Sequence, residues 1–202
     1  MVPSDVAVKE APTRADSEQI VNDFSIQVAT VNGSGSQTAN LVLLRAIFQM
    51  GVPVSGKNMF PSNIAGLPTW FTIRTNKDGY IGWKKKTEVL VAMNPETARE
   101  DVLNLDAGSA VIYDEPLQLD SVRSDLVFYP VPFDTLVAAS CPDAKLRRLV
   151  RNTIYDGVLA QLLRIDRQQH RRVVGRRIGV RKAPAEGAPI PHLWVSDRRR
   201  RI

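Results

Sequence analysis

An apolar run that leads through a glycine turn into a second apolar run constrains the fold of this chain more than any other feature. Residues 26–31 are β-branched and strand-like, residues 32–37 form the turn, and residues 38–50 have a helix pattern. In α/β proteins this arrangement points free backbone N–H groups at a negatively charged ligand. The stretch predicts a phosphate-type site. The alternative is that Gly33 and Gly35 only make a tight connection through the positive φ that glycine tolerates.

The charges around the turn favour an anion. Residues 24–77 contain no Asp or Glu, and their charged side chains are all cationic: Arg45, Lys57, Arg74 and Lys77. The window therefore offers no carboxylate for general acid or base catalysis, and none for a hard metal ion. A nicotinamide or flavin site is disfavoured, because Thr38 occupies the place of the third glycine and no acidic residue follows until Asp78.

The composition indicates one globular core. The chain has 202 residues, of which 44% are apolar, enough for a single domain that we place at residues 23–166. We expect residues 1–22 to be disordered and residues 167–202 to form an atypical arginine-rich tail. One cysteine and two histidines are too few for a structural zinc or an iron–sulfur cluster. No apolar run reaches the roughly 18 residues of a membrane span, so we expect a cytoplasmic protein without a membrane partner.

Strand and helix patterns alternate along the chain. They predict an α/β fold of three layers, with a mostly parallel sheet, helices on both faces and an edge hairpin. The predicted strands include residues 26–31, 52–54, 70–74, 80–83, 89–92, 110–113 and 126–129, and the predicted helices cover residues 38–50, 133–139 and 142–163 with a further helix opening at Pro95. Residues 70–74 and 80–83 are expected to pair as the hairpin, and Asn94 to cap the helix at Pro95.

The cysteine, the aromatic side chains of the predicted hairpin and the serines of the turn could each have a chemical role or a structural one. Cys141 has no histidine in the folded body to activate it, so we expect a structural thiol. The aromatic side chains of the predicted hairpin could stack on an adenine ring, but we favour a subunit contact for them. The hydroxyls of Ser34 and Ser36 could bind phosphate or cap the helix.

Five segments carry a family resemblance: residues 31–36, residues 60–71, Ile73-Arg74, Met93-Asn94-Pro95 and residues 155–160. Together they resemble the gamma domain of 2-oxoacid:ferredoxin oxidoreductases, in the form fused to the N-terminus of the large subunit of 2-oxoglutarate-type enzymes. Such complexes decarboxylate a 2-oxoacid such as pyruvate or 2-oxoglutarate on thiamine diphosphate, pass electrons through iron–sulfur clusters to ferredoxin, and release an acyl-coenzyme A. The gamma domain packs against the thiamine-binding domains and takes part in handling coenzyme A.

The resemblance implies a set of binding residues. They match the turn and the second signature of the family: Gly33, Ser34, Gly35, Ser36, Asn63, Gly66 and Arg74. The chain departs from the separate gamma subunits, in which glycines stand at the positions of Ser36 and Thr38 and an Arg-Gly-Gly stands at residues 64–66. These departures affect the ligand contacts.

The resemblance also implies what this chain lacks. The Tyr-Pro-Ile-Thr-Pro signature of the second domain, the Gly-Asp-Gly thiamine–magnesium motif and the cluster cysteines are absent from the sequence. We therefore expect no catalytic residue and no metal in this chain. Coenzyme A is the candidate ligand, thiamine diphosphate, Mg²⁺ and [4Fe-4S] clusters belong to partner domains, and ferredoxin is an indirect partner.

The C-terminal residues depart from the family pattern. Residues 167–202 hold ten arginines and one lysine against Glu186 and Asp197, a net charge of +9, whereas the whole chain carries +6 and residues 1–166 therefore −3. The alternative function is a binding module for nucleic acid or an acidic partner through this tail. We favour a shifted reading frame near codon 166 and do not expect a nucleic-acid partner. Translation of the other two frames from codon 160 onward tests this expectation.

The isolated chain is predicted to have no 2-oxoacid oxidoreductase activity, because it lacks the thiamine motif, the cluster cysteines and the paired domain. The measurement is coenzyme A-dependent reduction of a ferredoxin or viologen by the pure chain in the presence of a 2-oxoacid. Reduction above the rate of a protein-free blank would contradict the prediction.

Overall fold

The computed structural model describes residues 22–60, 64–144 and 146–165. The predicted N-terminal segment and the arginine-rich tail lie outside these residues, except for Asn22. The strands are β1 (Asp23–Val31), β2 (Val54–Met59), β3 (Pro68–Asn76), β4 (Val89–Ala92), β5 (Ala110–Asp114) and β6 (Val127–Val131). The helices are α1 (Ser36–Gln49), α2 (Ala98–Leu103), α3 (Phe133–Ser140) and α4 (Arg147–Leu162), with two 3₁₀ turns, η1 (Glu115–Leu117) and η2 (Leu119–Ser121).

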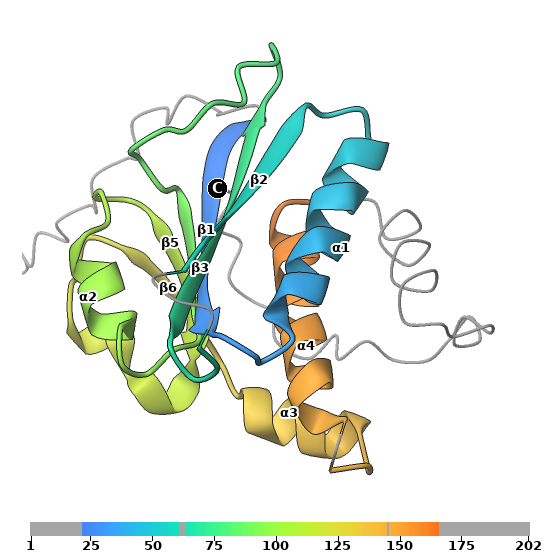
Figure 1. The fold of residues 1–202 in the computed structure, drawn as a ribbon. Helices are drawn as coiled ribbons and strands as arrows, with labels where there is room; N and C mark the ends of the chain where they lie inside the picture. The colour runs from blue at the N-terminus through green and yellow to red at the C-terminus, as the bar shows by residue number, and fades with distance from the viewer. Residues whose placement is uncertain (1–21, 61–63, 145, 166–202) are drawn as a thin grey trace, which may run out of the picture.

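The strands form one sheet in the order β2-β3-β1-β4-β5-β6. β1, β4, β5 and β6 are parallel neighbours, whereas β3 runs antiparallel to both β1 and β2. Figure 1 shows the sheet as the middle layer, with α1 and α4 on one face and α2 on the other. The predicted three-layer α/β fold is confirmed, with a mixed sheet in which three of the five pairings described are parallel.

The edge hairpin is formed by other residues than those predicted. β3 pairs with β2 at the edge of the sheet, and residues 80–83 are not a strand. The predicted pairing of residues 70–74 with 80–83 is wrong because Asn76 closes a local turn: its Oδ1 accepts hydrogen bonds from the N–H groups of Asp78 (2.9 Å) and Tyr80 (3.0 Å). The prediction assigned one edge of β3 to residues 80–83, but that edge pairs with β2.

Two predicted helix starts also differ from the structure. α2 begins at Ala98, and Asn94 instead closes a preceding turn, in which its Oδ1 accepts a hydrogen bond from Glu96 N–H at 3.1 Å. α4 begins at Arg147, five residues after the predicted start at Pro142. Both differences fall at helix ends, where proline and asparagine stabilise turns as well as helix starts.

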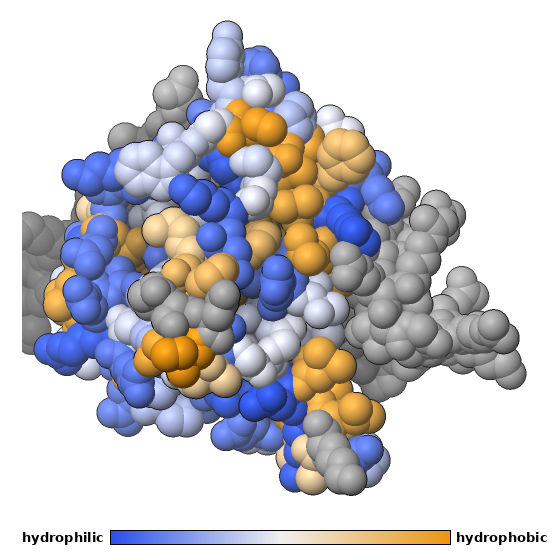
Figure 2. All heavy atoms as spheres, in the orientation of Figure 1, coloured by the Kyte–Doolittle hydropathy of each residue, from blue (hydrophilic) through white to orange (hydrophobic). Residues whose placement is uncertain are grey.

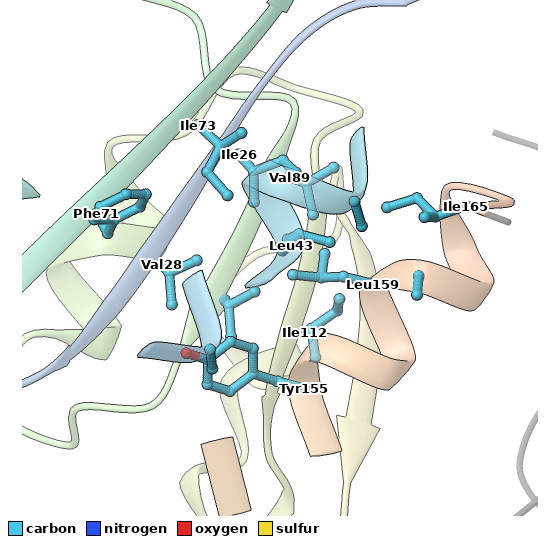
Figure 3. Close-up of a cluster of buried hydrophobic side chains, with 14 of the residues drawn as sticks. Ile26, Val28, Leu43, Phe71, Ile73, Val89, Ile112, Tyr155, Leu159 and Ile165 are labelled. Carbon is cyan, nitrogen blue, oxygen red and sulfur yellow. The ribbon is translucent and has the colours of Figure 1, made fainter. Parts of the chain in front are cut away.

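Apolar side chains pack on both faces of the sheet. β1 alternates, so that Ile26 and Val28 face α1 and α4 whereas Ala29 faces α2. All residues of β4 and β5 are buried, as expected for central parallel strands. Figure 3 shows the larger cluster, where side chains of β1, β3, β4, β5, α1 and α4 meet.

A buried tyrosine joins α4 to the start of α1. Tyr155 is 0% exposed, and its hydroxyl donates to Asn40 Oδ1 at 2.9 Å and approaches Ser36 O at 3.3 Å. Burial raises the pKa of Tyr155 well above its ordinary value, so the hydroxyl stays a donor into the alkaline range. Helix α4 is thereby fixed against α1 by a hydrogen bond inside the core.

Tyr155→Phe is expected to lower the free energy of unfolding by about 1–2 kcal/mol, because it leaves Asn40 Oδ1 buried without its donor. Urea denaturation followed by circular dichroism measures the change. The control is Tyr80→Phe, which removes the same hydroxyl from a side chain that is 77% exposed, and which should change stability by less than about 0.5 kcal/mol. Equal effects of the two substitutions would show that the buried hydrogen bond contributes nothing.

Candidate functional site

A cleft of about 310 Å³ lies at the carboxyl ends of β1 and β4. Its walls come from the β1–α1 turn, residues 65–66, Met93 after β4, and the first turns of α4. β1 leads through α1 toward β2 and β3, whereas β4 leads through α2 to β5 in the opposite direction along the sheet. Ligands of open α/β sheets bind where the connections diverge in this way, which makes the cleft the candidate binding site.

The β1–α1 turn has the conformation that its glycines were predicted to provide. Gly33 and Gly35 have φ values of +81° and +84°, and Gly35 is the N-cap of α1. Ser34 N–H donates to Val31 O at 3.1 Å, which closes the turn. No side chain caps α1 and its first turn contains no acidic residue. The start of α1 therefore presents N–H groups and about half a positive charge without a neutralising carboxylate.

The segment before β3 forms the second wall. Asn32 N–H donates to Leu67 O at 2.8 Å, and Gly66 N–H donates back to Asn32 O at 3.0 Å. Gly66 has a φ of +97°, which a residue with a Cβ rarely adopts. The structure thus brings Gly66, one of the residues that the resemblance implied, to the turn, whereas Asn63 lies outside the described residues.

The first turns of α4 form the third wall, although the sequence pattern of this segment predicted only an amphipathic helix. Asn152 is buried, and its Nδ2 donates to Ser34 O at 2.8 Å. Arg148 and Arg151 line the same cleft. The spacing of these three residues places them on one helix face, and two arginines on that face are a signal that the sequence contained.

Arg151 is held by acidic residues of two other elements. Its guanidinium forms an ion pair with Asp114 at the end of β5, lies 3.8 Å from Asp134 of α3, and sits 5.8 Å from the centre of the Phe133 ring. Burial raises the pKa of Asp114, and Arg151 acts in the opposite direction. The main role of Arg151 is therefore to compensate carboxylates beside the cleft.

The two serines of the turn have different surroundings. Ser36 is 6% exposed and its Oγ shares a hydrogen bond of 2.8 Å with Thr30 Oγ1, so its hydroxyl is already used within the protein. Ser34 Oγ is buried and has no hydrogen-bond partner among the described residues. Neither hydroxyl caps α1. The hydroxyl of Ser36 is therefore engaged inside the protein, whereas backbone N–H groups and the hydroxyl of Ser34 are the donors of this turn that are unpartnered within the part of the chain described.

Arg74 does not lie with the other predicted binding residues. It pairs with Ser25 in the sheet, whereas the turn follows Val31 at the other end of β1, about 20 Å away along the strand. Arg74 is 8% exposed, forms an ion pair with Asp23 and donates to Phe24 O at 3.2 Å. Hydrogen bonds from Arg74 lower the pKa of Asp23. These contacts fix the start of β1 against β3.

The remaining candidates are structural in the part of the chain described. Cys141 is a buried thiol whose Sγ contacts Asp143 O at 3.3 Å. No three His, Cys, Asp or Glu side chains of the described residues come close enough together to hold a metal ion. No helix in residues 22–60, 64–144 and 146–165 is both long and apolar enough to cross a membrane.

A family model described as pyruvate ferredoxin/flavodoxin oxidoreductase matches residues 25–186, a range that runs past the boundary predicted at residue 166. The search of curated proteins gives no match.

Solved structures give the same fold. A chain of the 2-oxoglutarate:ferredoxin oxidoreductase from Magnetococcus marinus, with 2-oxoglutarate, coenzyme A and succinyl-CoA bound, matches with a TM-score of 0.71 at 22% identity, over 81% of this chain and 28% of that chain. The gamma subunit of a keto/oxoacid ferredoxin oxidoreductase from Geobacter sulfurreducens matches with a TM-score of 0.62 at 13% identity, over 76% and 86%. Pyruvate oxidoreductase subunit PORC from Thermotoga maritima matches with 0.59 at 16%, over 81% and 88%.

Arg151→Met is expected to lower the free energy of unfolding at pH 7 by about 2 kcal/mol, because it leaves Asp114 charged and buried without a cation. The loss of Arg151 also raises the pKa of Asp114 further, so the folded variant takes up a proton more readily than the unfolded chain. The deficit should therefore shrink as the pH falls toward the acidic range. Urea denaturation at several pH values measures it.

The double variant Asp114→Asn/Arg151→Met provides the control for this prediction. It removes the carboxylate together with its partner, and should recover much of the lost stability at pH 7. A double variant as unstable as Arg151→Met at every pH would contradict the assigned role of Arg151.

Proposed function

The chain belongs to the pyruvate ferredoxin/flavodoxin oxidoreductase family, and we propose that it is a gamma-type component of a 2-oxoacid:ferredoxin oxidoreductase. In this role it binds the phosphate groups of coenzyme A in the cleft. The observation that carries the proposal is the start of α1: two glycines with positive φ, no cap and no acidic residue in the first turn. Such a helix start favours an anion through both its N–H groups and its dipole.

The residues of the cleft suit a phosphate group. None of its described lining residues is Asp or Glu, and two of them are arginines. A volume of about 310 Å³ is at the lower end of the range for small-molecule sites. The cleft would thus hold the charged part of coenzyme A, while the thiol end extends toward a reaction centre outside this chain.

Exposed apolar side chains support a role in subunit packing. Figure 2 shows apolar residues gathered over β2 and α1 on one face of the molecule. Phe48, at the end of α1 that leads into β2, is 66% exposed, and Met59 and Phe60 are exposed at the opposite end of β2. Apolar patches on a protein surface mark contacts with other proteins. We assign this face to other domains or subunits of the complex.

The proposal leaves the redox chemistry to those partners. Thiamine diphosphate and Mg²⁺ would supply the decarboxylation, and [4Fe-4S] clusters would carry the electrons to ferredoxin, all outside this chain. Among the three structures named, the highest TM-score and identity belong to the 2-oxoglutarate enzyme. We therefore propose the 2-oxoglutarate type. The chain spans only 28% of the length of that enzyme's chain.

Calorimetric titration of the full chain with coenzyme A tests the proposal. Binding should be measurable, and Gly35→Ala should weaken it about tenfold, because a Cβ at a φ of +84° strains the turn that presents the N–H groups. An added Cβ at Gly35 would meet Leu149 and Asn152 only at ordinary contact distances of 3.5 and 3.7 Å, so the fold should persist.

The matched control for this experiment is Gly79→Ala. Gly79 has a φ of +86° and open space around an added Cβ, but it lies in the turn after β3, at the other end of that strand from the cleft. The control should show a similar loss of stability and unchanged binding. Absence of coenzyme A binding by the unaltered chain would overturn the proposed function.

A further inference from the structure

Two arginines of α4 line the cleft, and carboxylates hold only one of them. Arg151 pairs with Asp114 and lies near Asp134. Arg148 is exposed, and no carboxylate in the part of the chain described forms an ion pair with it. The charge of Arg151 is thus compensated within the protein, whereas that of Arg148 is available to a ligand.

The position of Arg148 relative to the turn follows from the helix. Asn152 donates to Ser34 O, which fixes its place on α4 against the turn. Arg148 precedes Asn152 by four residues and is therefore on the same face, about 6 Å further along the helix axis. Leu149, next to it, lies close to Gly35. The cleft therefore has two positive points that one ligand can reach: the start of α1 and the guanidinium of Arg148.

From this arrangement we infer that Arg148 is a specificity-determining residue that binds a second phosphate group of the ligand, a terminal phosphomonoester. The inference rests on the proposed function, in which the cleft binds the phosphate groups of coenzyme A, and it places the diphosphate at the start of α1. Coenzyme A carries a separate phosphate on its ribose, which has a charge close to −2 at neutral pH. A guanidinium binds such a group through paired hydrogen bonds. The guanidinium of Arg148 forms no ion pair with a carboxylate of the described residues, so it can bind the phosphate.

The alternative explanation is that Arg148 only adds positive potential to this end of the molecule. Any cation at the start of α4 would then serve equally well, and ligands would be affected in proportion to their total charge. Arg147 tests this alternative. It has the same charge and is the preceding residue of α4, but its Nε donates to Cys141 O at 3.2 Å and it does not line the cleft.

The experiment compares coenzyme A with 3′-dephospho-coenzyme A, titrated calorimetrically into the full chain and into the variants Arg148→Ala and Arg147→Ala. We expect the unaltered chain to prefer coenzyme A. Arg148→Ala should weaken coenzyme A at least tenfold, as loss of a charge-assisted hydrogen bond does, and should change dephospho-coenzyme A less than threefold. Arg147→Ala should leave the ratio of the two dissociation constants unchanged.

The other possible results distinguish failure of the inference from failure of the proposed function. Equal weakening of both ligands by Arg148→Ala, or a similar effect of Arg147→Ala, would show a general electrostatic role and overturn the inference, while the proposed function stands. Binding of both ligands with no effect of Arg148→Ala would overturn it as well. Failure of the unaltered chain to bind either ligand would overturn the inference together with the proposed function.

Discussion

The candidate site depends on the contact between α4 and the β1–α1 turn. Asn152 donates to the carbonyl of Ser34, and Tyr155, one turn further along, donates to Asn40 inside the core. The first contact gives the Ser34 carbonyl of the turn a hydrogen-bond donor. The second fixes the rotation of α4 about its own axis. Because of both, Arg148 and Arg151 of α4 line the cleft together with Gly33 and Ser34 of the turn. Without this contact the turn would be an ordinary strand-to-helix connection.

Electrostatics separates the structural cations from those available to a ligand. Arg74 and Arg151 are both engaged by carboxylates, one at the start of β1 and the other beside the cleft. The positive groups of the site that no carboxylate of the described residues compensates are then the start of α1 and the exposed side chain of Arg148. The absence of acidic residues over residues 24–77 keeps the turn free of internal anions. An anionic ligand therefore competes with no carboxylate from this part of the chain.

The parts of the fold that depend on neighbouring residues were predictable from the sequence. The strand–turn–helix unit, the buried strands β4 and β5, and the positive φ of the glycines follow from local patterns. The hairpin was misassigned because strand partners depend on contacts distant in sequence. Arg74 was predicted to bind ligand together with the turn, and the structure separates them for a related reason. In the antiparallel register of β3, Pro68 lies beside the end of β1 at the turn, whereas Arg74 lies near the start of β1. The i, i+4 spacing of Arg148 and Asn152 showed that they share a helix face, but their roles depend on contact with a turn more than a hundred residues earlier in the chain, and no local pattern indicates that contact.

The same separation in sequence has a consequence for the order of events during synthesis. The turn is made early, with β1 and α1, whereas Asn152 follows it by 118 residues. Strands β1 to β3 can pair on the growing chain as soon as they are available, but the cleft has its third wall only after α4 has been translated and has docked. A nascent chain can thus have a nearly complete sheet and no ligand site. Completion of the cleft therefore reports that α4 is in place.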